Sequence, residues 1–172
     1  MARRSRAREV ALQVLYEIDR NPHVPEGLDE RFVRERLRGA DLRQFASDII
    51  AGVRTKREQL DRLVLEIAQN WSLSRMTPID RSILRLATFE ILFRDDIPPK
   101  VAVDEAIELA KRYGTADSPR FVNGILDRIL TSHPRDPGAP TDPPYTSLPS
   151  GEKGRGEESR RADAEQPASS IG

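Results

Sequence analysis

The sequence begins with a cluster of arginines that continues directly into a helical pattern. Arg3, Arg4, Arg6 and Arg8 all precede the first acidic residue, Glu9. Guanidinium groups bind phosphates through paired hydrogen bonds and stack on unpaired bases, and arginine-rich segments often become ordered on RNA. The cluster is therefore consistent with a nucleic-acid contact or with an ordinary solvated chain end, and these four residues alone leave both open.

A second candidate contact region lies where the last helical segment begins. Asp117 and Ser118 precede a proline, which suits the first turn of a helix, and the free N–H groups of such a turn attract anions. Arg120 adds positive charge, and Tyr113 and Phe121 offer aromatic faces for stacking. Asp117 opposes an anion here. The alternative is that Phe121 belongs to the core and that Asp117 or Ser118 only caps the helix.

Residues suited to enzymatic chemistry are scarce. The chain has no cysteine, and its two histidines both lie beside prolines. It has no glycine-rich phosphate loop, no spacing of metal ligands and no nucleophile elbow. Glu90 shares a helical stripe with apolar residues, and a buried carboxyl with a raised pKa can act as a general acid. Such a carboxyl is more often hydrogen-bonded to a neighbouring helix or an arginine. We therefore expect a structural role for Glu90, and no catalytic, cofactor or metal site.

Apolar residues recur with helical spacing through residues 5–130, and strand alternation is almost absent. This pattern predicts an all-α fold, a compact bundle of about seven helices. The predicted segments have apolar stripes at 7–18, 42–53, 60–71 and 122–129, a short segment at 29–37, a fifth helix that begins at Thr77 and a sixth that ends near Tyr113.

Several predicted helices have residues at their ends that commonly cap helices. Thr77 is suited to cap the fifth helix, and Asp80 in its first turn interacts favourably with the helix dipole. The fifth helix is apolar on nearly every side, so it is predicted to be central. Gly114 is the expected C-terminal cap of the sixth helix. Gly124 costs the seventh helix about 1 kcal/mol relative to alanine, and close helix packing is the expected reason for it.

Composition changes sharply after the last helical segment. Residues 133–172 contain seven of the 13 prolines and few large apolar residues. Such a segment buries too little apolar surface to offset its ordering entropy. The predicted organisation is a helical domain at 1–131 and a disordered Pro/Gly-rich tail at 132–172. No apolar run approaches the roughly 20 residues of a membrane span, and no signal-peptide block is present, so a cytoplasmic protein is expected.

Several segments resemble the NusB family of transcription antitermination factors. They are RAREVALQVLYEID, LRQFASDIIAGV, LDRLVLEIAQNWSLSRMTPIDRSILRLATFEIL, IPPKVAVDEAIELAKRYG and DSPRFVNGILDRI, which occur in this order along residues 3–130. The resemblance implies a helical factor that binds RNA and protein and is not an enzyme. It implies boxA-type single-stranded RNA of ribosomal RNA leaders and spacers as ligand. NusE, a ribosomal small-subunit protein, and an RNA polymerase antitermination complex are the implied partners, for a monomer or homodimer.

The resemblance also assigns contact residues. Ser5 and Pro119 depart from the pattern of the family and place contacts at these positions in doubt. The implied RNA contacts are Arg3, Arg4, Arg6, Arg8, Tyr113, Asp117, Ser118, Arg120 and Phe121, and the implied NusE contacts are Tyr16, Asp80 and Arg85.

Two alternatives belong to other classes of protein. A NusB-like domain also precedes the catalytic domain of some ribosomal RNA cytosine methyltransferases, but the roughly 40 residues after the helical segments are too few for a domain that binds S-adenosylmethionine. The other alternative is a protein–protein adaptor without RNA binding, or a self-associating form that buries the RNA surface.

Overall fold

The computed structural model describes residues 2–25, 27–69 and 76–135, and these residues contain seven α-helices and no strand. This confirms the all-α prediction. The predicted extension of the fourth stripe to Trp71 and the predicted tail beyond residue 135 lie outside the described residues. The helices are α1 (Ala2–Arg20), α2 (Leu28–Arg36), α3 (Ala40–Thr55), α4 (Arg57–Ala68), α5 (Pro78–Phe93), α6 (Pro99–Tyr113) and α7 (Ser118–Ser132).

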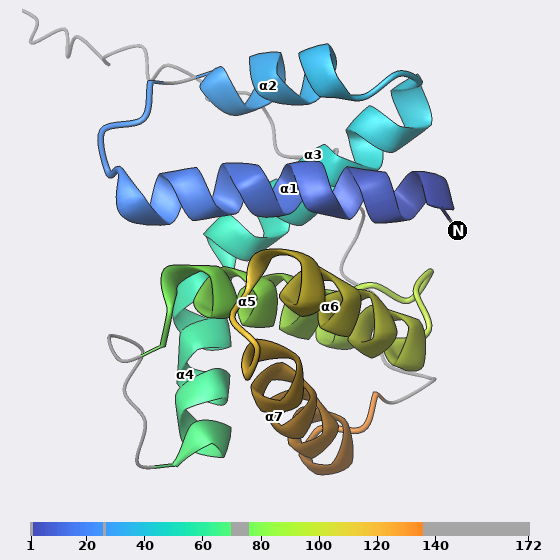
Figure 1. Ribbon diagram of the computed structural model, residues 1–172. Helices are drawn as coiled ribbons and strands as arrows, with labels where there is room; N and C mark the ends of the chain where they lie inside the picture. Colours follow the sequence, from blue (N-terminus) through green and yellow to red (C-terminus); the bar gives the residue numbers. More distant parts are fainter. Residues whose placement is uncertain (1, 26, 70–75, 136–172) are drawn as a thin grey trace, which may run out of the picture.

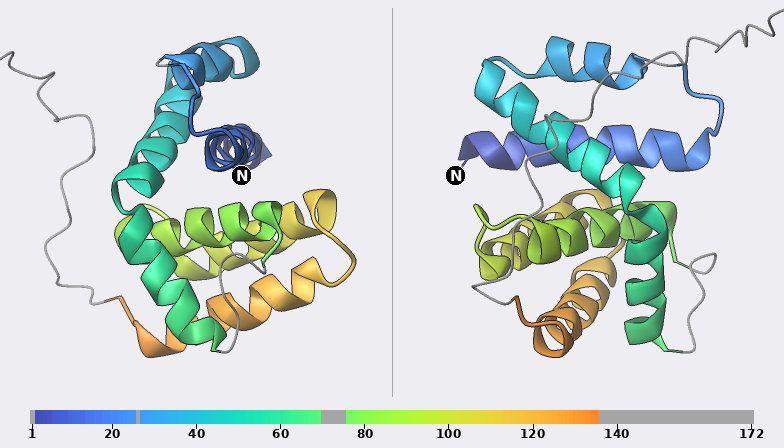
Figure 2. Two further views of the ribbon diagram at one scale, coloured as in Figure 1. Left: turned by 90° about the vertical axis from the view of Figure 1, so that its left-hand side faces the viewer. Right: turned by 180° about the vertical axis from the view of Figure 1, so that it is seen from behind.

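The helices form two groups that share one core. Figure 1 shows α1 and α2 in an upper group and α4, α5, α6 and α7 in a lower group, and α3 crosses between them. The two further views in Figure 2 show the same division. Helix α5 contacts α1, α3, α4, α6 and α7, and every residue from Ser82 to Ile91 is buried. The prediction that this helix is central is confirmed.

Helix ends follow the sequence signals only in part. Thr77 Oγ1 accepts a hydrogen bond from the Asp80 N–H at 3.2 Å, as predicted. Gly114 ends α6 in an extended conformation. A Cβ at this position would lie 2.5 Å from the Ser118 side chain, so the close approach of Ser118 to the Gly114 backbone requires a glycine. Neither predicted cap acts on α7. The Asp117 side chain makes no capping bond, and the Ser118 hydroxyl accepts from the Thr115 N–H at 2.9 Å.

The described fold extends beyond the last helix. The Arg135 guanidinium donates to the carbonyl oxygens of Glu90 at 2.8 Å, Ile91 at 3.0 Å and Ile97 at 3.1 Å. Two of these carbonyls belong to the last turn of α5, where a cation also interacts favourably with the helix dipole. Arg135, which follows α7, is therefore packed against the helical domain. No helix in the described ranges is long and apolar enough to cross a membrane.

The predicted reason for Gly124 is wrong. A Cβ added at Gly124 would meet no heavy atom within 4 Å, so no close helix contact requires a glycine there. At Gly52 in α3, by contrast, an added Cβ would lie 2.0 Å from the Phe89 ring. The close crossing of helices therefore occurs between α3 and α5.

The two glycines should respond in opposite ways to alanine. Gly124→Ala should raise the free energy of unfolding by about 0.5–1 kcal/mol, because alanine favours the helix and meets open space. Gly52→Ala should lower it by about 1–3 kcal/mol, because the methyl group overpacks the core against Phe89. Urea unfolding followed by circular dichroism measures both. A stability loss in Gly124→Ala would contradict the open surroundings of this residue.

Candidate nucleic-acid interface

The arginines at the start of α1 divide into exposed and buried side chains. Arg3, Arg4 and Arg6 are exposed, whereas Arg8 is only 1% exposed. Arg8 Nε donates to both carboxylate oxygens of Glu90, at 2.8 and 3.1 Å. The prediction that Arg8 contacts RNA is therefore wrong for its side chain, which lies inside the core and points away from solvent.

Glu90 is the buried partner of Arg8, and its side chain is fully buried. Burial raises the pKa of Glu90 to about 7, although the charge and hydrogen bonds of Arg8 act in the opposite direction. The expectation that this carboxyl is hydrogen-bonded to an arginine is confirmed. The pair joins α1 to α5 and so fixes the start of α1 on the body of the domain.

The ring of Phe45 on α3 contacts three guanidinium groups. The guanidinium carbons of Arg4, Arg8 and Arg94 lie 4.9, 5.1 and 5.2 Å from the ring centroid. Such cation–π contacts stabilise more when the cation is desolvated. Arg4 also lies 3.5 Å from the Asp96 carboxylate, after α5. The first turns of α1 are therefore held by α3, α5 and the segment that follows α5.

Glu9 connects the exposed arginines of α1 to the end of α6. It is largely buried and accepts a hydrogen bond from Arg6 Nη1 at 2.7 Å, and its other oxygen accepts from Arg112 Nη1. The Arg112 side chain is 64% exposed, so its remaining donors face solvent. We call Arg3, Arg4, Arg6 and Arg112 the arginine surface.

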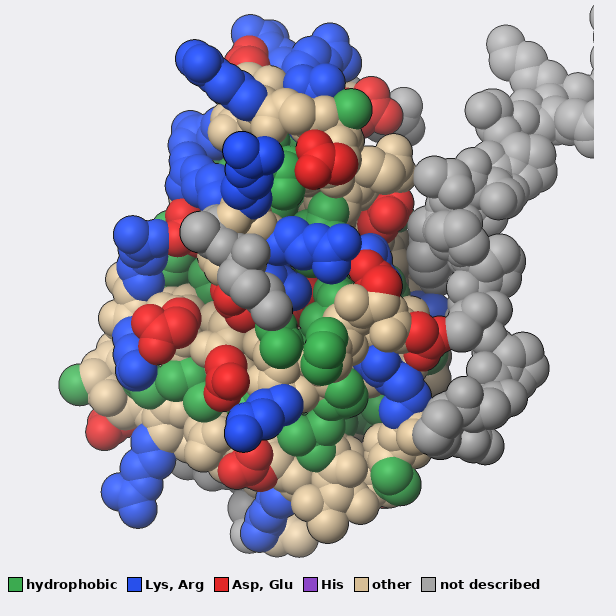
Figure 3. Space-filling view, turned by 90° about the vertical axis from the view of Figure 1, so that its right-hand side faces the viewer, with side chains coloured by type: hydrophobic (Ala, Val, Ile, Leu, Met, Phe, Trp, Pro, Cys, Tyr) green, Lys and Arg blue, Asp and Glu red, His purple; other side chains and the backbone are tan. Residues whose placement is uncertain are grey.

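Sequence reasoning missed Arg112. Its signal was the Lys–Arg pair just before Tyr113, but cations in the last turn of a helix are common because they complement the dipole. Figure 3 views the molecule from the end where α1 begins, and Lys and Arg side chains are spread over this face among Asp and Glu. Individual arginines, and not a uniform positive patch, therefore carry the positive charge of this face.

The second candidate region is only partly accessible. Asp117 and Arg120 are exposed, and Tyr113 and Phe121 are half-buried and pack against the core. Ser118 is 1% exposed, and its hydroxyl serves the turn before α7. The predicted contact by Ser118 is therefore wrong for its side chain, and the other four remain candidates.

Two of the three predicted partner contacts are internal. Asp80 is 6% exposed and Arg85 is 5% exposed. Arg85 donates to Asp61 at 2.6 and 2.9 Å and to Asp19 at 2.9 Å, which joins α1, α4 and α5. Burial alone would raise the pKa of Asp19, but the hydrogen bonds and charges of Arg81 and Arg85 lower it below its usual value. Arg85 therefore serves the fold, and burial leaves almost none of the Asp80 and Arg85 side chains accessible for the predicted contact with a partner.

Tyr16 is the remaining candidate for a partner surface. It is half-buried on α1, and the guanidinium of Arg20 lies 5.5 Å from its ring centroid. In the part of the chain that the structure describes, no group of His, Asp or Glu side chains is arranged to hold a metal ion.

Comparison with known proteins shows to which family this chain belongs. A family model for the NusB family matches residues 5–131, which covers α1 to α7 almost completely. The chain belongs to the NusB family. The resemblance stated from the sequence is therefore confirmed.

Two NusB relatives match this chain over nearly the whole of their own length. The transcription antitermination protein NusB of Geobacter sulfurreducens is 45% identical over 135 residues, which are 78% of this chain and 98% of the relative. That of Desulfotalea psychrophila is 46% identical over 140 residues, 76% of this chain and 97% of the relative. The correspondence therefore extends over the helical domain as a whole.

Solved NusB structures share the fold. NusB of T. maritima has a TM-score of 0.68 at 39% identity, covering 76% of this chain and 92% of that chain. A structure of antitermination factors NusB and NusE in complex with double-stranded RNA has a TM-score of 0.70 at 26% identity, covering 77% and 99%. The NusB fold of this chain is thus supported by structure as well as by sequence.

Proposed function

We propose that this NusB family member is a transcription antitermination factor. It binds boxA-type RNA of ribosomal RNA leaders and spacers together with NusE, and the pair joins an RNA polymerase antitermination complex. This activity makes or breaks no covalent bond. It takes place in the cytoplasm, where nascent RNA is made. The observation that carries the proposal is the arginine surface, which presents exposed guanidinium groups from α1 and α6 on a rigid helical body.

Binding has two physical components. Arginines that neutralise phosphates release counterions, which makes the affinity depend on salt. Aromatic side chains at Tyr113 and Phe121 can add stacking, which contributes about 1–3 kcal/mol for each base. A partner bound beside the RNA surface raises the effective concentration of the second contact, so the pair should bind RNA more tightly than either protein alone.

The decisive experiment measures RNA binding with and without the NusE partner. Fluorescence anisotropy should compare a labelled boxA leader RNA, a scrambled RNA of the same composition and a duplex form. We expect the partner to raise affinity for boxA RNA on the order of 10²-fold and to leave the scrambled RNA weakly bound. Equal binding of boxA and scrambled RNA, with and without the partner, would leave only sequence-independent RNA binding and would contradict the proposed function. Light scattering on the same samples distinguishes a monomer from a homodimer.

A single charge tests the second contact region. Asp117→Asn should tighten RNA binding by up to about fivefold, because an exposed carboxylate beside Arg120 repels phosphate. The change should leave stability intact, since this side chain makes no capping bond. Asp127→Asn, also exposed on α7, is the matched control. A drop in affinity specific to Asp117→Asn would mean that the carboxylate itself accepts a hydrogen bond from RNA.

A further inference from the structure

A second group of arginines lies where α2 meets α3, outside the arginine surface. Only residues 37–39 separate the two helices, and Gly39 has a φ of 103°, a conformation that glycine adopts readily and that lets the chain turn within this short connection. Cations from two helices and their connection therefore meet at one corner of the domain. We call them the α2–α3 surface, which consists of Arg34, Arg36, Arg38 and Arg43.

The guanidinium groups of this surface are available to a ligand. Arg34 and Arg38 are exposed and Arg43 is half-buried, and none of the three makes a hydrogen bond, ion pair or ring contact with other residues that the structure describes. The exposed Arg36 stacks over the Phe32 ring at 4.1 Å. Stacking leaves the N–H groups at the rim of a guanidinium group able to donate to phosphate.

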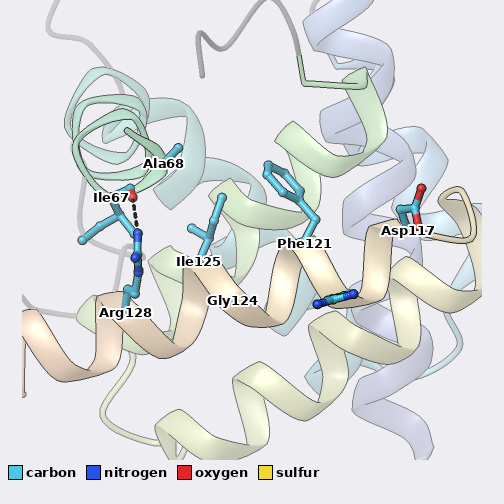
Figure 4. A pocket seen from close by; sticks show the side chains of 8 residues that line it. Ile67, Ala68, Asp117, Phe121, Gly124, Ile125 and Arg128 are labelled. Carbon is cyan, nitrogen blue, oxygen red and sulfur yellow. Dashed lines mark hydrogen bonds between the residues drawn. The ribbon is translucent and has the colours of Figure 1, made fainter. Parts of the chain in front are cut away.

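Exposed arginines elsewhere hold one helix to another. Figure 4 shows the open groove that α4 and α7 form around Gly124, where Arg128 Nη1 donates to the Ile67 carbonyl oxygen at 3.3 Å. Arg54 of α3 likewise pairs with Asp29 of α2 at 3.2 Å. Within the described ranges, the α2–α3 surface holds no such link between helices.

The helix dipole explains only part of the α2–α3 surface. Arg34 and Arg36 lie in the last turn of α2, where cations are favourable. Arg38 lies beyond that turn, and Arg43 lies in the first turn of α3, where a cation is unfavourable. The positions of these two arginines therefore favour a role outside the helices themselves.

The surroundings of the surface suit phosphate better than protein. Residues 34–43 contain four arginines and two acids, and one of the acids, Glu35, is paired with Arg31 at 3.0 Å. The large apolar residues of this stretch, Leu37 and Leu42, pack against the core. Protein interfaces centre on apolar side chains, whereas phosphates need only cations.

The α2–α3 surface adjoins the arginine surface. Phe45 of α3 has the Arg4 guanidinium 4.9 Å from its ring centroid, and α1 packs against both α2 and α3. Figure 1 places the connection between α2 and α3 at the same end of the molecule as the start of α1. In Figure 3, which views this end, Lys and Arg side chains gather along the upper edge, over α2 and the start of α3. A strand that crosses the arginine surface can therefore continue onto the α2–α3 surface.

We propose that the α2–α3 surface binds the phosphate backbone of RNA that flanks boxA. The assignment rests on the proposed function and adds a separate site for RNA outside the boxA element. Phosphate contacts carry no sequence information, so the flanking RNA is held whatever its bases are. The site therefore lengthens the bound strand and raises its affinity in a manner that depends on salt.

Extended RNAs test this site in the unchanged protein. Fluorescence anisotropy should compare boxA RNA alone with boxA RNA that carries about ten uridines at its 5′ or its 3′ end, a length within the range of single-strand binding sites. One extension should raise affinity about tenfold at 0.1 M salt. It should also steepen the slope of log affinity against log salt by about 2, because three phosphate contacts contribute about 0.7 each on a single strand.

Alanine at Arg34, Arg38 and Arg43 together should abolish the gain from the extension and leave the affinity for boxA RNA alone unchanged. These side chains make no contact with other described residues, so the fold should persist, which thermal melting verifies. The matched control removes the same charge from exposed side chains at the end of α3 and on α4, at Arg54, Arg57 and Arg62. This control should keep the gain.

A spin label on the far end of the effective extension gives a reading that needs no variant. It should broaden the backbone amide NMR signals of residues 34–43 and leave those of α4 sharp. No gain from either extension would leave the surface to an acidic protein partner and overturn the proposal, as would a gain that persists in the triple variant. Equal losses on extended and unextended RNA would also overturn it, because the surface would then act on boxA itself. The preference for boxA over scrambled RNA tests the proposed function separately.

Discussion

Arg8→Met should lower the free energy of unfolding by about 3–5 kcal/mol, the cost of leaving one member of a buried ion pair without its partner. Glu90 is fully buried and receives both of its Arg8 hydrogen bonds from one nitrogen, at 2.8 and 3.1 Å. Methionine fills much of the arginine volume but supplies neither charge nor donor. Urea unfolding at pH 8, above the pKa of about 7 that Glu90 has beside Arg8, measures the loss.

The matched control removes both charges. Arg8→Met combined with Glu90→Leu should recover most of the stability, because apolar side chains of similar volume often replace a buried pair at little cost. A double-mutant cycle then gives the coupling between the two residues. If the double variant is as unstable as the sum of the two single variants, the two residues are not coupled as the structure indicates.

The same pair gives the domain a pH dependence. The pKa of Glu90 in the folded state, about 7, is above its ordinary value of 4.5, so the folded protein holds this proton more tightly than the unfolded chain. The stability contributed by this group is therefore present at low pH and falls as pH rises from about 4.5 to 7. The penalty of Arg8→Met should consequently be smaller at pH 5 than at pH 8, because the stranded carboxyl is then neutral.

Alanine at Arg3, Arg4 and Arg6 together should weaken RNA binding about 100-fold at 0.1 M salt. Each lost phosphate contact lowers the slope of log affinity against log salt by about 0.7 for a single strand, so three contacts lower it by about 2. All three side chains are exposed, and the domain should remain folded. Fluorescence anisotropy across a salt series measures both quantities.

A control variant must show that the position of the three arginines matters, and not only the loss of three positive charges. Alanine at Arg54, Arg57 and Arg62 removes the same charge from exposed side chains near the junction of α3 and α4 and on α4, which Figure 1 places away from the start of α1. This variant should retain the affinity and the salt slope of the unchanged protein. An unchanged slope in the α1 variant, or equal losses in both, would remove the RNA role of the arginine surface.

Local patterns predicted the helices well because their causes are local. Apolar spacing, the Thr77 cap and the apolar surroundings of α5 all act within a few residues, and the structure has each of them. The expected arginine or helix partner for Glu90 was also correct. What spacing could not supply was the identity of that partner, which lies 82 residues away in the chain.

The errors have a common physical origin. The resemblance assigned Arg8, Asp80 and Arg85 to contacts with RNA or a partner, yet their side chains are buried on helices with several packed neighbours. Charged residues are mostly exposed, and the few that are fully buried need a partner that spacing alone does not reveal. Arg8 lies one turn before the buried Leu12, which was a usable signal. Gly124 was misread because an open groove and a close helix contact both accommodate glycine.

The contact between Arg112 and Glu9 spans 103 residues and has a consequence for synthesis on the ribosome. Helix α1 precedes α5 and α6 in the chain, but the residues that pair with Arg8 and Glu9 come from α5 and α6. Contacts so distant in sequence form only after their loops close, and chains emerge at about 5–20 residues per second. For several seconds the nascent chain therefore carries this arginine-bearing amphipathic helix without the partners that α5 and α6 later supply.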